Sequence, residues 1–172
     1  MKEEITICKL RPWTLADKDA LTVYANNPLI AQNMMDQFPH PFTEEKAIQF
    51  IERVSSTSIP NILAIAVDNK VVGSIGIHPL HDIERINAEL GYWLAEPYWG
   101  KGIMTEAIRQ MVAYGFANFE IQRIFARPFG HNYGSQKALE KAGFILEAKF
   151  EKTFIKNGQL IDEWIYGMRR PA

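Results

Sequence analysis

Two glycines, Gly100 and Gly102, form the part of this sequence that most constrains its chemistry. They follow an apolar segment with the pattern of a strand, residues 88–95, and precede a segment with helical periodicity, residues 105–118. Glycine lets a backbone turn sharply and bring its amide groups close to a ligand. Because the first amides of a helix lack intrahelical partners and lie at the positive end of its dipole, such a turn suits a diphosphate. A turn that only connects a strand to a helix is the alternative interpretation.

The residues around this turn belong to a longer pattern. The runs AELGYWL at 88–94, YWGKG at 98–102 and TEA at 105–107 resemble the acyl-CoA-binding motif of the GNAT superfamily of N-acetyltransferases. The chain most resembles the branch that contains the ribosomal-protein N-terminal acetyltransferases. Pro97 stands where the superfamily often has Gln or Arg, and Pro is common in that branch. The resemblance implies that acetyl-CoA is the acetyl donor.

A second group of motifs extends the resemblance over nearly the whole chain. NYGS at 132–135 and LEKAGF at 139–144 follow at the superfamily's usual spacing. LRPW at 10–13 and the Asn-Gly pair at 157–158 fit the same branch. We therefore expect a single N-acetyltransferase domain over residues 1–172.

The resemblance also implies how acetyl-CoA binds. In the family, the strand before the glycine turn parts from its neighbour, and the gap takes the pantetheine arm as an added strand. Backbone groups of Trp93, Leu94 and Ala95 are expected to bind that arm. The amides expected to hold the pyrophosphate are those of Gly100, Lys101, Gly102, Ile103, Met104 and Thr105.

Two polar side chains within the motifs are candidates for the chemistry itself. Glu89 matches a position where several family members carry a catalytic carboxylate, which can take the proton that an amine must lose before it attacks a thioester. Ser135 matches a serine near the cofactor sulfur that could stabilise the departing thiolate. A solvated Glu89 and a Ser135 with only a local backbone bond are the alternatives. Leu139 stands where many members have a tyrosine as general acid, so that role has no obvious holder here.

Other polar residues have plainer interpretations. Asn132 contacts the pantetheine arm in the family, yet Asn is also a favoured N-cap for the helix that follows. The Lys101 ammonium either adds charge beside the pyrophosphate or is simply solvated. Cys8 has no evident activating partner, which favours a small buried hydrophobe over a nucleophile. His78 and His81 flank Pro79 in an expected loop, and the histidines show no helical metal-binding pair.

Composition narrows the class of protein. A chain of 172 residues that is 47% hydrophobic is long enough for one well-packed core. A formal net charge of −1 argues against a nucleic-acid-binding module. No apolar stretch approaches the roughly 20 residues that span a bilayer, and the charged N-terminus lacks the apolar core of a secretory signal. With a single cysteine, which suits a reducing compartment, we expect a cytoplasmic protein.

Local patterns predict the element order β-α-α-β-β-β-α-β-α-β-β, in an α/β (α+β) fold with a mixed, mostly antiparallel sheet of about seven strands. Adjacent hairpins disfavour a doubly wound dinucleotide fold. The expected strands are 5–10, 62–67, 71–77, 86–95, 123–127, 144–155 and 160–168, and the expected helices are 14–26, one from Thr43 onward, 105–118 and 135–142. A capping box at Thr14 and Asp17 is expected to begin the first helix, Asn-Pro at 27–28 to end it, and Thr43 to be the N-cap of the second. Hairpin turns are expected at 68–70 and 157–158.

These observations lead to an acetyl-CoA-dependent N-acetyltransferase that acts in a ternary complex, with a primary amine as acceptor. The acceptor is a protein N-terminus or a small amine. Its binding site is expected to be shaped by the first two helices, the loop 33–42 and the final hairpin. The rival from another class is a non-catalytic acyl-CoA-binding or regulatory module, which would need neither Glu89 nor Ser135. A nucleotide-phosphate binder would require a Gly-Lys-Ser/Thr motif, whereas Gly102 is followed by Ile103 and Met104. Edge strands of such folds often mediate homodimers, although no residue here indicates one.

Overall fold

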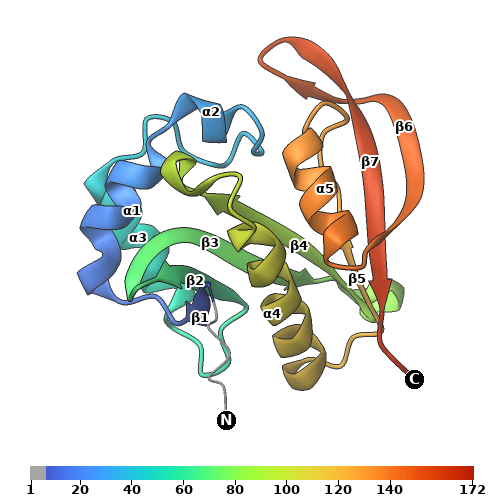
Figure 1. The fold of residues 1–172 in the computed structure, drawn as a ribbon, viewed down its shortest axis with the longest axis horizontal. Coiled ribbons are helices and arrows are strands. Elements are labelled where there is room, and N and C mark those ends of the chain that lie inside the picture. The colour runs from blue at the N-terminus through green and yellow to red at the C-terminus, as the bar shows by residue number, and fades with distance from the viewer. Residues whose placement is uncertain (1–6) are drawn as a thin grey trace.

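The computed structural model describes residues 7–172, which form one seven-stranded sheet with helices on both faces (Figure 1). The strands are β1 (Lys9–Arg11), β2 (Ile62–Val67), β3 (Lys70–Pro79), β4 (Asn87–Leu94), β5 (Arg123–Ala126), β6 (Ile145–Lys156) and β7 (Gln159–Arg169). The helices are α1 (Lys18–Ala25), α2 (Pro28–Ala31), α3 (Glu44–Val54), α4 (Ile103–Asn118) and α5 (Tyr133–Lys141).

The strand order across the sheet is β1-β2-β3-β4-β5-β7-β6. Neighbours pair antiparallel except β4 and β5, which run parallel because α4 connects them across one face. The predicted fold class, a mixed and mostly antiparallel sheet of seven strands, is confirmed.

Two hydrophobic clusters hold the helices to the sheet. The larger lies beneath α4 and α5 and includes Ile77, Ile108 and Tyr166, each fully buried. The smaller lies on the opposite face beneath α1 and α3, where the Trp13 ring meets Phe50 edge-on at a centroid distance of 5.4 Å. Figure 1 shows the first three helices gathered on one side of the molecule, and α5 beside the long β6–β7 hairpin on the other. Each face of the sheet therefore has its own hydrophobic cluster.

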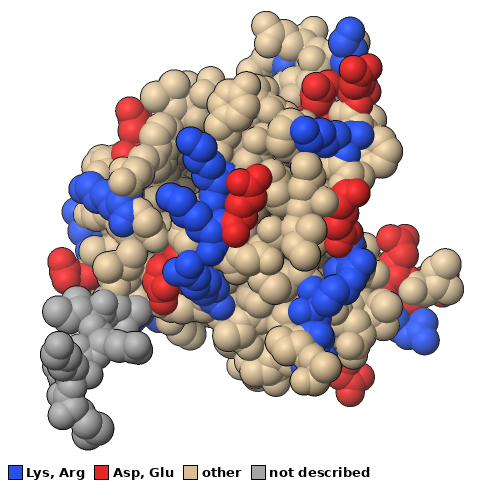
Figure 2. Space-filling model, turned by 45° about the vertical axis from the view of Figure 1, so that its right-hand side comes forward, with Lys and Arg blue, Asp and Glu red and all other residues tan. Residues whose placement is uncertain are grey.

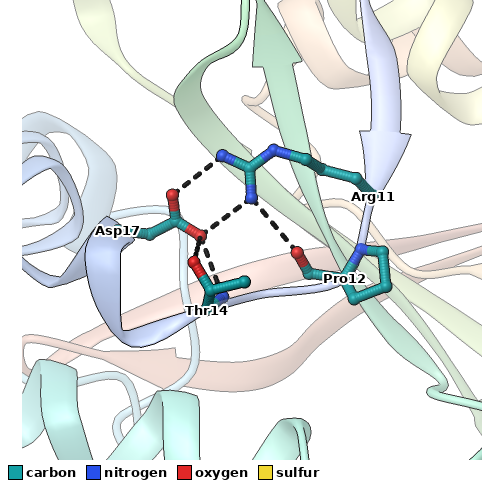
Figure 3. Close-up of polar contacts among 4 residues, drawn as sticks. All are labelled: Arg11, Pro12, Thr14 and Asp17. Atoms are coloured by element: carbon teal, nitrogen blue, oxygen red, sulfur yellow. Dashed lines mark hydrogen bonds and ion pairs between the residues drawn. The ribbon is translucent and has the colours of Figure 1, made fainter.

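The chain enters the first helix through a charged capping arrangement (Figure 3). Arg11 donates through both terminal nitrogens to the Asp17 carboxylate, at 2.9 and 2.8 Å, and the Thr14 amide donates to the same group at 2.9 Å. Burial alone would raise the pKa of Asp17, but the hydrogen bonds from Arg11 and Thr14 outweigh it and hold that pKa below its usual value. The predicted capping box at Thr14 and Asp17 is confirmed.

Several predicted boundaries shift by a few residues. A 3₁₀ turn over Leu15–Asp17 precedes α1, and Asn27 caps the short helix α2, which the sequence reasoning missed because Asn-Pro was interpreted only as a stop. The helix after the glycine turn begins at Ile103 rather than at residue 105. Of the first predicted strand, residues 5 and 6 lie outside the described part, and the strand itself is Lys9–Arg11.

Both predicted hairpin turns are present, and each has two residues in its loop. Asp68 and Asn69 have φ of 48° and 68°, and Asn157 and Gly158 have φ of 51° and 75°. Two successive left-handed residues define a type I′ turn, whose twist matches that of the strands it joins.

Within residues 7–172, none of the helices combines the length and the apolar character that crossing a membrane requires. On the face shown in Figure 2, basic and acidic side chains both occur, and several basic side chains adjoin one another left of its centre, with acidic ones beside them.

Arg170 ties the end of the chain to the end of α4. Its guanidinium donates to the carbonyls of Ile121, Phe116 and Phe119 at 2.8, 2.8 and 3.0 Å. The last carbonyls of a helix lack intrahelical donors and carry its negative dipole end, so a cation here satisfies both needs.

We expect Arg170→Met to lower the free energy of unfolding by about 2 kcal/mol, since several charge-assisted bonds to carbonyls are lost together. Neighbouring Arg169 supplies the matched control, because its side chain is 65% exposed and, among the described residues, forms a single ion pair, with Glu147 at 3.5 Å. Arg169→Met should cost less than about 1 kcal/mol. Urea denaturation of both variants measures the difference, and equal losses would contradict the capping role.

Candidate active site

The two central strands part from each other soon after they meet. β4 and β5 pair only at Asn87 with Arg123, Ala88 with Ile124 and Glu89 with Phe125. Beyond Glu89, β4 continues to Leu94 paired with β3 alone, while Ala126 of β5 pairs with β7. A gap between β4 and β5 thus leaves one backbone edge of β4 without a strand partner in the middle of the sheet.

The glycine turn lies just beyond the end of β4. Gly100 and Gly102 adopt left-handed φ angles of 71° and 77°, and Gly102 is the N-cap of the 16-residue helix α4. A Cβ added at Gly100 would have no neighbour within 4 Å, and one at Gly102 would meet only Ile7, at 3.9 Å. The space beside both glycines is therefore open, and the first turn of α4, whose amides have no intrahelical partners, follows directly. This geometry fits a phosphate group.

Two of the predicted pantetheine-binding backbone groups already have partners within the chain. The Ala95 amide donates to the Val72 carbonyl at 2.8 Å, and the Leu94 carbonyl accepts from the Trp99 indole at 2.7 Å. Trp99 thereby anchors the glycine turn to the end of β4. The Lys101 ammonium lies 5.6 Å from the centre of the Tyr98 ring in the same turn.

Ser135 and Asn132 lie at the start of α5. The Asn132 side chain accepts from the Ser135 amide at 3.4 Å and so caps the helix, in line with the plainer of its two interpretations. The Ser135 hydroxyl bonds to the Tyr92 hydroxyl, so this contact joins β4 to α5. Burial raises the pKa of Tyr92 well above its usual value, which keeps its proton in place. Leu139 is fully buried in the core.

Glu89 lies on the opposite face of β4 and is not simply solvated. Its two carboxylate oxygens accept from Arg127 Nε and Nη2 at 3.0 and 3.1 Å, a bidentate pair. Arg127 also contacts Glu163 of β7 at 3.3 Å, and Thr153 of β6 donates to Glu163 at 3.0 Å. This charge cluster, Glu89, Arg127 and Glu163, carries one net negative charge.

The sequence reasoning missed Arg127, Tyr92 and Glu163, because their partners are distant in sequence and no local pattern reveals them. It was also wrong about His78, which lies in β3 rather than in a loop. The alternation Ser74, Gly76, His78 was the available signal, and Pro79 is tolerated because it ends the strand.

Two of the segments that are expected to shape the acceptor site, the loop 33–42 and the final hairpin, contact each other. Phe38, in the loop after α2, lies 6.3 Å from Trp93 at the end of β4, measured between ring centres. Lys156, at the end of β6, is paired with Asp36 of the same loop at 3.0 Å. The loop and the final hairpin therefore meet beside the acceptor face of β4, the face that carries Glu89 and Trp93.

Comparisons with known proteins agree with this geometry. A family profile described as an acetyltransferase (GNAT) domain matches residues 8–145. The uncharacterized N-acetyltransferase p20 of Bacillus licheniformis is 31% identical over 165 residues, covering 92% of this chain and 90% of the relative.

Solved structures share the fold. The microcin C7 self immunity acetyltransferase MccE, in complex with acetyl-CoA and AMP, aligns with a TM-score of 0.79 at 26% identity, over 95% of this chain and 92% of its own. The ribosomal L7/L12 alpha-N-protein acetyltransferase RimL, in complex with coenzyme A, aligns with a TM-score of 0.79 at 21% identity, over 95% and 94%. A parted pair of parallel strands, an open glycine turn and these matches lead to one conclusion: the chain belongs to the GNAT family and is an N-acetyltransferase that uses acetyl-CoA.

Proposed function

We propose that this enzyme transfers the acetyl group directly to a primary amine within a ternary complex. The observation that carries the proposal is the separation of polar groups on the two faces of β4. Ser135 and Tyr92 meet on one face, and Glu89 with Arg127 lies on the other. A thiolate can leave toward the first face while an amine approaches from the second. A non-catalytic acyl-CoA-binding module would require neither arrangement.

In this proposal the pyrophosphate lies against the amides of residues 100–105, and the pantetheine arm lies along the unpaired edge of β4. With Leu94 O and Ala95 N–H already engaged, the remaining backbone groups of Trp93 and Leu94 bind the arm. Asn132 caps α5 and at the same time faces the arm. Lys101 adds a positive charge at the turn.

The acceptor is a cationic amine, either a protein N-terminus or a small molecule. At neutral pH a primary amine is mostly an ammonium ion, and the charge cluster on the acceptor face has one net negative charge to attract it. RimL, which shares the fold, is an alpha-N-protein acetyltransferase by name, and this makes a peptide N-terminus the first acceptor to test. We propose that the amine loses its proton on this face, beside Glu89, and that the Glu89 carboxylate takes part in that step.

On the leaving-group face, Tyr92 retains its proton and can donate to the Ser135 oxygen. The Ser135 hydroxyl hydrogen is then free to point at the sulfur as negative charge develops there. Tyr92 thus compensates for the tyrosine that Leu139 replaces, by acting on Ser135 from the strand instead of from the helix.

We also infer a single domain over residues 1–172, since the sheet draws strands from residue 9 to residue 169. The lone cysteine suits the cytoplasm. A homodimer through the β6 edge would cover its exposed apolar residues Ile145, Leu146 and Phe150.

An acceptor screen tests the proposed function. Acetyl-CoA is incubated with a dipeptide carrying a free N-terminus, an N-blocked lysine peptide, putrescine and ethanolamine, and release of free CoA thiol is followed. We expect amine-dependent thiol release and an acetylated product by mass spectrometry. CoA binding without turnover of any amine would favour the non-catalytic module.

Gly102→Glu should reduce CoA affinity at least tenfold, because a carboxylate and a Cβ would stand where the amides meet phosphate. Gly158→Glu is the matched control, since Gly158 has a similar left-handed φ, 75° against 77° for Gly102, in a distant hairpin turn. Isothermal calorimetry on both folded variants makes the comparison. Unchanged CoA affinity in the Gly102 variant would remove the pyrophosphate from this turn.

Transfer should proceed without an acetyl-enzyme. Cys8 is the chain's single thiol, and burial, followed by the nearby charge of Glu106, raises its pKa to about 11, so at neutral pH it holds little thiolate. Intact-mass measurement after mixing with acetyl-CoA alone should show no added acetyl group. A stable adduct that disappears in Cys8→Ala would overturn direct transfer.

Ser135→Ala and Tyr92→Phe should each lower kcat by less than about a hundredfold, the lower limit for a positioned general base, with acetyl-CoA affinity nearly constant. Because Tyr92 is proposed to act through Ser135, the double variant should be no slower than the slower single variant. Multiplicative losses would show that the two hydroxyls act independently.

A further inference from the structure

One side chain that the proposed reaction has not used lies directly beside Glu89. His78 of β3 is the register partner of Glu89, and opposite residues of an antiparallel pair project from the same face. The next pairs along the same face are Gly76 with Gly91 and Ser74 with Trp93. His78 therefore belongs to the acceptor face, on the strand next to β4.

The imidazole borders an open space above Gly91. A Cβ added at Gly91 would meet a single protein atom within 4 Å among the described residues, His78 Nε2 at 3.9 Å. Gly91 lies between Glu89 and Trp93 on the acceptor face of β4. Nε2 is thus displaced from Glu89 toward the end of β4 where the strands part and the thioester is proposed to lie. The missing side chain at Gly91 leaves room for an incoming amine.

Glu89 is already engaged by another side chain. Both of its oxygens accept from the Arg127 guanidinium, at 3.0 and 3.1 Å, in a bidentate pair. Because Arg127 is shared with Glu163, the three groups together keep a net negative charge beside His78. Held in this way, the Glu89 carboxylate can stabilise a positive charge on a neighbouring group.

The surroundings favour a neutral imidazole in the resting enzyme. His78 is exposed at the surface, yet the protein atoms around it still desolvate the imidazole in part. This desolvation lowers the pKa of His78, the Glu89 carboxylate of β4 opposes that effect, and the Arg53 guanidinium of α3 adds to it. Arg127, at the end of β5, is neutralised by its two carboxylates. A neutral histidine at pH 7 has a nitrogen lone pair available to accept a proton.

We propose that His78 Nε2 is the atom that accepts the proton of the acceptor ammonium, and that Glu89, held by Arg127, stabilises the imidazolium that forms. This rests on the proposed acetyl transfer. The ammonium N–H bond breaks and a proton passes to Nε2, which later releases it to water. The neutral amine forms the new C–N bond to the acetyl carbon as the C–S bond breaks. The second proton that nitrogen loses ends on the CoA sulfur.

The test compares kcat against pH for the wild type, His78→Gln, Glu89→Gln and the control His81→Gln, with acetyl-CoA and the dipeptide amine saturating. His81 is exposed like His78, but it lies beyond the end of β3 and is not paired with β4. We expect His78→Gln to lower kcat on the order of a hundred- to ten-thousandfold and to abolish the acidic limb of the profile. Glu89→Gln should keep that limb but move it to lower pH, since losing the carboxylate lowers the pKa of His78. His81→Gln should behave like the wild type.

A second variant tests the open space above Gly91 without changing a group that can accept a proton. Gly91→Ala meets His78 at an ordinary contact distance, so it should fold and bind acetyl-CoA normally. It should nevertheless raise the KM of the amine severalfold, because its methyl group occupies the approach to Nε2.

The outcomes separate the two claims. If the wild type turns over and His78→Gln keeps both its rate and its acidic limb, the His78 assignment is overturned while the acetyl transfer stands. If the limb disappears in Glu89→Gln and persists in His78→Gln, Glu89 is the proton acceptor instead. A wild type that binds CoA but acetylates none of the amines contradicts the proposed function and this assignment with it.

Discussion

The brevity of the β4–β5 pairing is the constraint on which the rest of the site depends. Three residue pairs hold the two parallel strands together before they part, so β4 presents an unpaired backbone edge inside the sheet. Buried backbone groups without partners are costly, and an exposed strand edge is a template for another strand. An extended ligand with amide groups satisfies that edge, which is the physical reason that a pantetheine arm suits this gap.

Beyond the last backbone pair between β4 and β5, side-chain hydrogen bonds connect β4 to the elements around it. On one face, the Tyr92 and Ser135 hydroxyls join β4 to α5. On the other, Arg127 connects Glu89 of β4 to Glu163 of β7, and Thr153 extends the connection to β6. A network in which each charge has hydrogen-bonding partners can fix a geometry without a continuous ladder. The two halves of the sheet are thereby held apart at a defined separation while the space between them stays accessible.

The features that the sequence predicted correctly are those that neighbouring residues in the chain determine. The left-handed pair at Asn157 and Gly158 and the N-cap at Thr43 are set by residues adjacent in the chain, and each is present. Glu89 and Ser135 were identified through motifs, but their partners were not. Arg127 lies 38 residues from Glu89, and Tyr92 lies 43 residues from Ser135, so only the packed sheet brings them together. The position of His78 beside Glu89 could not be predicted for a related reason. It depends on the register between β3 and β4, which the hydrophobic pattern of β3 alone does not specify.

The alternation of β4 explains why one strand can serve both ends of the proposed reaction. Successive side chains point to opposite faces, so Tyr92 faces α5 while Gly91 and Trp93 face the acceptor loop. Proton removal from the amine and stabilisation of the sulfur then take place on opposite sides of a rigid, centrally placed strand. Because β3 is fully paired along this length, it fixes His78 against β4 more firmly than a loop would. The glycine at position 91 complements this arrangement, because it leaves space beside the His78 imidazole for the acceptor nitrogen of the proposed reaction.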